Sequence, residues 1–174
     1  MIFLLEFNFR YVEMGAIIVV LAVMGLLLFE FRNMKEQIKE RMGINNETIK
    51  MRLQALERLT VFTERNGLKN LVGRVDSMHM SAPSLHATLV ETIKTEYEYN
   101  ISQQIYVNPE VWNAVTRLKD QNIYIINQLA ASLPFEASAL DLGKRILEYS
   151  MMKDAELNQI VLDALQFEAK KILE

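Results

Sequence analysis

The residues of this chain that could perform chemistry are few, and their spacing forms no recognised catalytic group. The 174 residues include no cysteine, which excludes disulfides, thiolate metal sites and cysteine nucleophiles. The two histidines, His79 and His86, are separated by Pro83, and no Glu-x-x-His pair supplies a di-iron arrangement. The six glycines are isolated, so no phosphate-binding loop is present. We therefore expect no enzyme activity, no metal and no cofactor.

Three carboxylates are close enough in the sequence to suggest acid–base chemistry. They belong to Glu91, Glu96 and Glu98, of which the first and last are seven residues apart and share one face of a helix. A solvated helix surface produces the same pattern without catalysis, and we interpret the group in that way.

The most unusual polar stretch runs from Glu96 to Val107, where a predicted helix ends and the chain turns towards Asn108. Two interpretations are open: a corner whose hydrogen bonds are satisfied internally, or a pocket that contacts a ligand or partner. Trp112 anchors the corner in either case. The residues that we expect to contact a partner, if one binds, are Tyr97, Asn100, Gln103, Gln104, Tyr106, Trp112 and Asn122.

An uncharged apolar run from Met14 to Phe29 predicts a membrane-spanning helix. Its 16 residues span about 24 Å at ~1.5 Å per residue, slightly less than a hydrocarbon core. Adjoining apolar residues extend the segment to 12–31, with Glu13 and Glu30 near its ends. Because no polar face interrupts it, a buried helix of a soluble protein is the weaker interpretation. We expect a single-pass protein.

Charge predicts the orientation of this segment. Arg10 is the only basic residue before it, whereas four basic residues follow within ten positions. The positive-inside bias therefore places the N-terminus outside and the C-terminal part in the cytoplasm. Residues 1–11, with Phe3, Phe7 and Tyr11 in one stripe, are predicted to be an interfacial segment on the outer face. We call the four basic residues the basic collar: Arg32, Lys35, Lys39 and Arg41.

The collar can attract anionic lipid at about 1 kcal/mol per residue near the membrane surface. Residues 32–74 carry ten Lys/Arg and five Glu, whereas residues 75–174 carry eight Lys/Arg and fourteen Asp/Glu. Since the acidic part would repel phosphate, we expect the lipid bilayer and not nucleic acid as a partner.

Helix signals divide the remaining chain into a basic juxtamembrane helix with a hinge (32–45) and a cytoplasmic helical domain (46–174). Gly43 to Asn46 predicts the hinge, and Asn46 is predicted to cap a new helix that ends at Asn66. Gly67 is expected to close that helix in a left-handed conformation. The inward face of this helix is predicted to be Ile49, Leu53, Leu56, Thr60 and Thr63.

The domain is predicted to be an all-α, irregular bundle of four to five helices. A short turn at 68–75 precedes a helix from Ser81 to about Tyr106, whose inward stripe ends in Ile101 and Ile105. Asn108–Pro109 starts the helix with the clearest pattern, and Pro134 ends it. Its 4-3 spaced seam is Val111, Val115, Leu118, Asn122, Ile125, Leu129 and Ser132.

Two further helices are expected at the C-terminal end, from Ser138 to Ser150 and from about Asp154 onwards. The predicted inward residues are Leu142, Ile146 and Tyr149 in the first, and Leu157, Val161, Ala164, Leu165 and Ile172 in the second.

Three stretches carry a resemblance to a known family: Met51 to Thr60, the corner from Tyr97 to Val107, and Trp112. Over residues 50–174 the chain resembles a family of uncharacterised small membrane-anchored helical proteins from Bacteroidota. The resemblance implies a bacterial inner-membrane setting. It implies no activity and no catalytic residue.

Taken together, these features favour a membrane-anchored interaction or scaffold module that accompanies a larger membrane complex. Its partners would be other subunits of that complex or further copies of the chain. The alternative is a regulator that senses a ligand or partner at the Tyr97–Trp112 corner. An enzyme with an unfamiliar site is a third hypothesis, which a cleft holding two carboxylates of raised pKa would support.

Overall fold

The computed structural model describes residues 2–151 and 157–173, with side chains from Met14 onwards. These residues form six α-helices and one 3₁₀ helix, and the described part of the chain contains no strand beyond an isolated bridge between Ser81 and Ser138. The predicted all-α class is confirmed. The chain divides into two units, Met1–Thr48 and Ile49–Glu174, which we describe separately.

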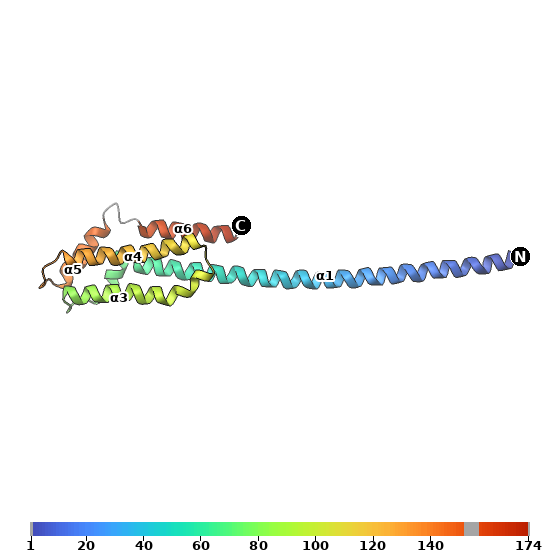
Figure 1. Cartoon of the computed structure of the whole chain (residues 1–174), viewed down its shortest axis with the longest axis horizontal. Helices are drawn as coiled ribbons and strands as arrows, with labels where there is room; N and C mark the ends of the chain where they lie inside the picture. Colours follow the sequence, from blue (N-terminus) through green and yellow to red (C-terminus); the bar gives the residue numbers. More distant parts are fainter. Residues whose placement is uncertain (1, 152–156, 174) are drawn as a thin grey trace. The chain divides into compact units, whose positions relative to one another are not determined.

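The first unit is the N-terminal part of helix α1, which runs from Ile2 to Asn66 without interruption (Figure 1). The helix break predicted at Gly43 to Asn46, and the cap at Asn46, are therefore wrong. A single helical glycine costs only about 1 kcal/mol relative to alanine, which flanking helix-forming residues offset. Across this stretch the Thr48 hydroxyl donates to the carbonyl oxygen of Ile44 at 3.0 Å.

The apolar segment of α1 lies open within its unit. Between Met14 and Phe31 the large hydrophobic side chains are 49% to 67% exposed. An 18-residue window in this helix has a mean hydropathy of 2.5, and none of the window is buried. By length and composition, α1 is therefore able to cross a membrane.

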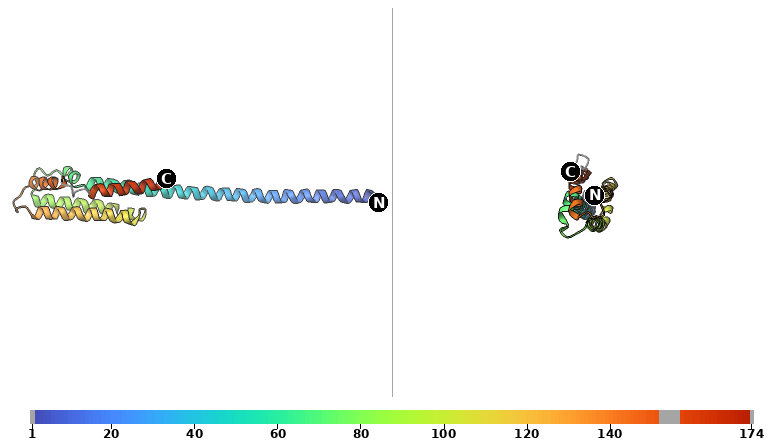
Figure 2. Two further views of the ribbon diagram at one scale, coloured as in Figure 1. Left: turned by 90° about the horizontal axis from the view of Figure 1, so that it is seen from above. Right: turned by 90° about the vertical axis from the view of Figure 1, so that its left-hand side faces the viewer.

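The second unit is a helical bundle formed by the end of α1 and five further helices. These are α2 (Leu68–Arg74), α3 (Ala82–Asn100), α4 (Pro109–Ala131), α5 (Ala139–Ser150) and α6 (Leu157–Leu173), with the 3₁₀ helix η1 at Ile101–Ile105. Helices α3 and α4 lie side by side in opposite directions (Figures 1 and 2). The expected start of the last helix near Asp154 lies outside the described residues.

The bundle has two hydrophobic clusters. One joins α2, α3, α5 and the end of α4 around Leu71, Leu89 and Leu142. The other joins α1, α4 and α6 around Leu59 and Leu118. Because α4 contributes to both, it connects the two halves of the core.

The predicted starts of three helices, at Ser81, Asn108 and Ser138, are confirmed, and each of these residues caps its helix. The Ser81 hydroxyl accepts from the amide of Ser84, and the Asn108 side chain accepts from that of Glu110. Ser138 and Asp141 form a capping box in which each side chain accepts from the other's backbone amide. Side chains that satisfy the first amides of a helix leave a local sequence signal, which explains this agreement.

Two predicted helix ends are corrected. Helix α3 ends at Asn100 instead of Tyr106, because the chain tightens into η1 with about three residues per turn. The four-residue stripe stops there, so Ile101 and Ile105 are exposed. Gly67 follows α1 as expected but with φ −55° and ψ 130°, which is not left-handed.

The seam predicted for α4 is buried from Val111 to Ile125, and it includes Asn122. Its last member, Ser132, is exposed, as is Thr60 on the predicted face of α1. The buried face of α1 is instead formed by Ala55, Leu56, Leu59, Phe62 and Thr63.

Candidate partner-binding site

The aromatic corner between α3 and α4 is filled by its own side chains. Tyr97 stacks on Trp112 with ring centroids 5.3 Å apart, and it meets Phe62 in an edge-to-face arrangement with centroids 6.1 Å apart. The Tyr97 hydroxyl lies 3.0 Å from Oγ1 of Thr116, and Lys119 Nζ lies 4.5 Å from the centre of the Tyr97 ring. The ring and the hydroxyl of Tyr97 thus have partners within the bundle.

The polar residues of the corner are divided between interior and surface. Asn100 is buried, and its Nδ2 donates to the carbonyl oxygen of Glu96 at 2.8 Å. Gln103 is buried and donates to the hydroxyl of Ser102 at 3.1 Å. Gln104 is exposed, whereas Tyr106 is half-buried against the second cluster. Internal hydrogen bonds therefore account for Asn100 and Gln103.

Asn122 does not join this corner. It is buried further along α4, where its Nδ2 donates to the backbone carbonyl of Asn66 at 2.7 Å. That carbonyl is at the end of α1, where helical carbonyl groups have no partner within the helix. Asn122 thus fixes the end of α1 to α4.

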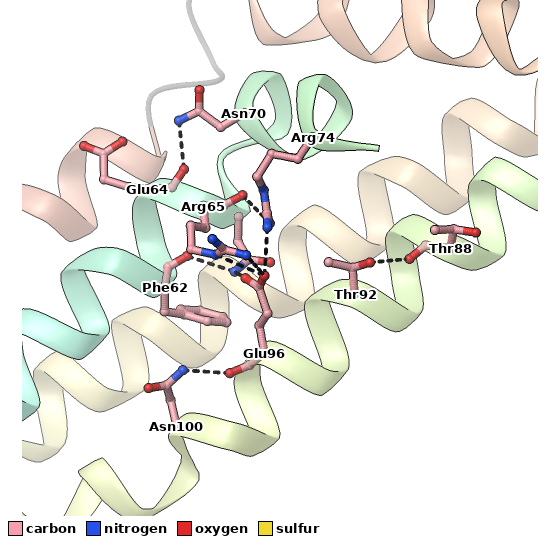
Figure 3. Close-up of polar contacts among 10 residues, drawn as sticks. Phe62, Glu64, Arg65, Asn70, Arg74, Thr88, Thr92, Glu96 and Asn100 are labelled. Carbon is pink, nitrogen blue, oxygen red and sulfur yellow. Dashed lines mark hydrogen bonds and ion pairs between the residues drawn. The ribbon is translucent and has the colours of Figure 1, made fainter. Parts of the chain in front are cut away.

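The end of α1 is also held by a cluster of charges centred on Glu96 of α3 (Figure 3). Oε1 of Glu96 accepts from Arg65 Nε at 3.1 Å, from Arg65 Nη2 at 2.8 Å and from Arg74 Nη1 at 2.9 Å. Its Oε2 accepts from Nδ2 of Asn66 at 2.9 Å. One carboxylate therefore joins α3 to α1 and α2.

Burial and hydrogen bonding act in opposite directions on this carboxylate. Partial burial of Glu96 raises its pKa, but hydrogen bonds from Arg65 and Arg74, with the attraction of their charges, outweigh that effect. The pKa of Glu96 is consequently lower than its ordinary value, and the pKa of Arg65 is raised by the same contact. The cluster is an ion pair at neutral pH, unlike a carboxyl group suited to general acid catalysis.

Helix α2 completes the attachment of α1. Arg74 Nη2 donates to the carbonyl oxygen of Arg65 at 3.0 Å, and Nδ2 of Asn70 donates to that of Glu64 at 2.8 Å (Figure 3). Together with Asn122, these side chains satisfy three of the terminal carbonyl groups of α1. The last turn of α1 is therefore bonded to α2, α3 and α4.

An open groove of about 590 Å³ lies beside the cluster, between α1 and α3. Its apolar surface includes the exposed side chains of Val61 and Tyr99. The Arg58 guanidinium lies 5.0 Å from the centre of the Tyr99 ring. Arg65 and Glu96 also line the groove. It is a surface of the second unit at which apolar and charged side chains are both available to a partner.

The basic collar lies on α1 in the first unit, and all four of its side chains are exposed. The side chains of the predicted aromatic stripe, Phe3, Phe7 and Tyr11, are not among those that the structure describes.

Sequence reasoning missed the arginines that hold Glu96. Arg65 is 31 positions from Glu96 and Arg74 is 22 positions away, so no local spacing connects them. Glu96 itself was assigned to a solvated surface, whereas its side chain is only 21% exposed. The one signal in the sequence was the position of Arg65, a basic residue in the last turn of α1.

The histidines lie apart from this region. His86 Nε2 is 2.7 Å from Oδ1 of Asn127, between α3 and α4. In the part of the chain from Met14 to Met151 and from Leu157 to Leu173, no group of three or more His, Asp or Glu side chains could hold a metal ion.

These features define a class: an all-helical chain whose first helix carries a long apolar segment and whose second unit is a helical bundle that holds the end of this helix through an ion-pair cluster. The chain belongs to the family described as "Family of unknown function (DUF7935)", which matches residues 4–172. The match extends through the apolar segment as well as the bundle. No curated protein and no solved structure matches the chain.

Proposed function

We propose that this protein is a membrane-anchored helical interaction module and an accessory component of a membrane-associated complex. The observation that carries the proposal is the open apolar surface of α1 between Met14 and Phe31. A contiguous apolar helix of this length is stable in lipid, where its side chains leave water and its backbone is satisfied internally. The segment is then a single-pass anchor.

The basic collar supports one orientation of this anchor. The four exposed cations follow the apolar segment directly, which favours a cytoplasmic location for the bundle and an outer location for the N-terminus. Near an anionic inner leaflet they would add electrostatic attraction to the membrane surface. The expected setting is a bacterial inner membrane.

The groove between α1 and α3 is the surface that we assign to protein partners. It presents Val61 and Tyr99, two exposed hydrophobic residues, next to the guanidinium of Arg58. Aromatic residues and arginine are enriched where protein interfaces have their strongest contacts. The partner is another subunit of the complex or a second copy of the chain.

The alternative function, a ligand-sensing regulator, would use the Tyr97–Trp112 corner. Its support is weaker because Trp112, Thr116 and Lys119 already contact the ring and the hydroxyl of Tyr97. A small molecule that raises the thermal unfolding midpoint of the wild type, but not of Trp112→Phe, would favour this function instead.

The absence of cysteine from the sequence provides a direct test of the anchor. Single-cysteine variants Asn8→Cys and Lys69→Cys are labelled in intact cells with a membrane-impermeant maleimide. We expect labelling of Asn8→Cys before lysis and of Lys69→Cys only after the inner membrane is opened. Recovery of the protein in the soluble fraction, or labelling of both variants at the same stage, contradicts the proposal.

A further inference from the structure

We propose that Asn66–Gly67, at the end of α1, is a latent site of covalent modification that reacts when this helix end opens. It is the one Asn-Gly pair in the sequence. Asparagine followed by glycine is the pair most prone to spontaneous deamidation, because glycine has no Cβ to hinder its own backbone nitrogen. The structure holds both reacting groups in a protected state.

The reaction needs only water. The backbone nitrogen of Gly67 loses its proton and attacks Cγ of Asn66; an N–C bond forms, the Cγ–Nδ2 bond breaks, and Nδ2 leaves as ammonia. Water then opens the five-membered imide at either carbonyl. The products at position 66 are aspartate and isoaspartate, each with a carboxylate in place of the amide and no change of oxidation state.

In the closed structure both participants are occupied. The Gly67 N–H donates to the carbonyl oxygens of Thr63 at 3.1 Å and Glu64 at 3.4 Å. Nδ2 of Asn66 donates to the carbonyl oxygen of Phe62 at 2.8 Å and to Oε2 of Glu96 at 2.9 Å. Asn66 is also 0% exposed. The nucleophile, the leaving nitrogen and water are thus kept from the reaction.

Glu96 controls the opening. Its carboxylate accepts from the Asn66 amide and is itself held by Arg65 and Arg74. Loss of these bonds frees the side chain of Asn66 and loosens the turn that retains the Gly67 N–H. The reaction rate should therefore follow the population of the locally opened state.

The product cannot restore the closed arrangement. Nδ2 of Asn66 now donates to Oε2 of Glu96 and to the carbonyl oxygen of Phe62. A carboxylate at position 66 would instead place an acceptor oxygen next to these two acceptors. Oδ1 of Asn66 is already buried without a hydrogen-bond partner among the described residues. Two acidic groups would then face each other in a partly buried site. Modification would permanently weaken the attachment of the end of α1 to α3.

The test uses the full chain in mild detergent, incubated at mildly alkaline pH and analysed by peptide mass mapping. We expect the folded protein to deamidate at Asn66 at least ~10-fold more slowly than the same protein in urea. Glu96→Ala should raise the rate of the folded protein several-fold. Glu91→Ala is the matched control and should leave the rate unchanged, since among the described residues Glu91 accepts only from Thr95 on the same helix. Gly67→Ala should slow the reaction in urea, which assigns it to this pair.

Equal rates in the folded and urea-treated wild type would overturn the proposal, as would a folded Glu96→Ala protein that reacts no faster than wild type. If Glu96→Ala does not fold, low urea concentrations replace it: the deamidation rate of the wild type must rise in parallel with hydrogen exchange of the Gly67 amide. The effect of the modification on the bundle is tested with Asn66→Asp, which should lower the thermal unfolding midpoint. The control is Asn113→Asp, on the exposed face of α4. Equal midpoints for these two variants contradict the proposed weakening of this attachment.

Discussion

Arg65 and Glu96 form a two-point contact in which Nε and Nη2 of the guanidinium both donate to Oε1 of the carboxylate, at 3.1 and 2.8 Å. The contact joins the last turn of α1 to the last part of α3. Since Asn66 and Arg74 bind the same carboxylate, Glu96 is the point at which α1, α2 and α3 are held together. The stability of the bundle should depend on it.

Glu96→Ala should destabilise the bundle by about 1–2 kcal/mol, because it removes the acceptor of a buried amide and the shared partner of two arginines. The thermal unfolding midpoint in detergent measures the change. Glu91→Ala, which removes a more exposed carboxylate from the same helix, should change the midpoint little. Equal shifts for the two variants would show that the cluster is ordinary surface charge.

Acid should weaken the same contact. The pKa of Glu96 is lower in the folded chain than its ordinary value of 4.5, despite the opposing effect of burial, because Arg65 and Arg74 stabilise the charged form. The contribution to stability is therefore complete above the ordinary pKa and is lost as the pH falls through the lower, folded value. Glu96→Gln should flatten this part of the stability–pH curve. If the stability of the wild type does not change over this pH range, the proposed contribution of ionised Glu96 is contradicted.

Asn122→Ala should destabilise the bundle by ~1–3 kcal/mol, since it leaves the buried carbonyl of Asn66 without its donor. Asn122→Asp should be worse, because a carboxylate cannot donate to that carbonyl and would be buried in the α4 seam. Chemical denaturation monitored by helicity compares both variants with Asn113→Ala, on the exposed side of α4. If Asn122→Ala is as stable as Asn113→Ala, the bond from Asn122 to Asn66 does not stabilise the bundle.

Ser138→Ala should remove the capping box of α5 at a cost of about 1 kcal/mol. The pKa of Asp141 is lowered mainly by the hydrogen bond from the Ser138 side chain, and also by the Ser138 backbone amide. Its pKa should therefore rise towards the ordinary value in the variant. An NMR titration of the Asp141 carboxyl carbon measures this directly. An unchanged titration would mean that the capping box does not persist in solution.

The parts of the fold that sequence reasoning predicted are those with local causes. The helix starts at Ser81, Asn108 and Ser138 were predicted, and each of these side chains satisfies a nearby amide; the α4 seam follows from spacing alone. The continuity of α1 through Gly43 was missed because one glycine is a weak breaker when both sides favour helix. The 3₁₀ helix at Ile101–Ile105 was missed because its residues continue an apolar stripe that the backbone does not follow.

The candidate site was less predictable because its contacts are long-range. The corner residues Tyr97 and Trp112 were identified from their types, and they do meet. The ion pairs of Glu96 and the bond from Asn122 to Asn66 depend on how helices pack, and one sequence contains no record of that. The groove at Val61 and Tyr99 arises in the same way.

Site-specific photo-cross-linking in native membranes tests the interaction module most directly. A photoreactive residue replaces Val61 in the groove, and a control replaces Tyr124, which is exposed on α4. We expect position 61 to give a discrete cross-linked species that contains a stoichiometric membrane subunit or a second copy of the chain. Tyr99→Ala and Arg58→Ala should weaken this species. The same pattern from both positions, or an uncross-linked monomer from position 61 in membranes and in several mild detergents, would contradict this expectation.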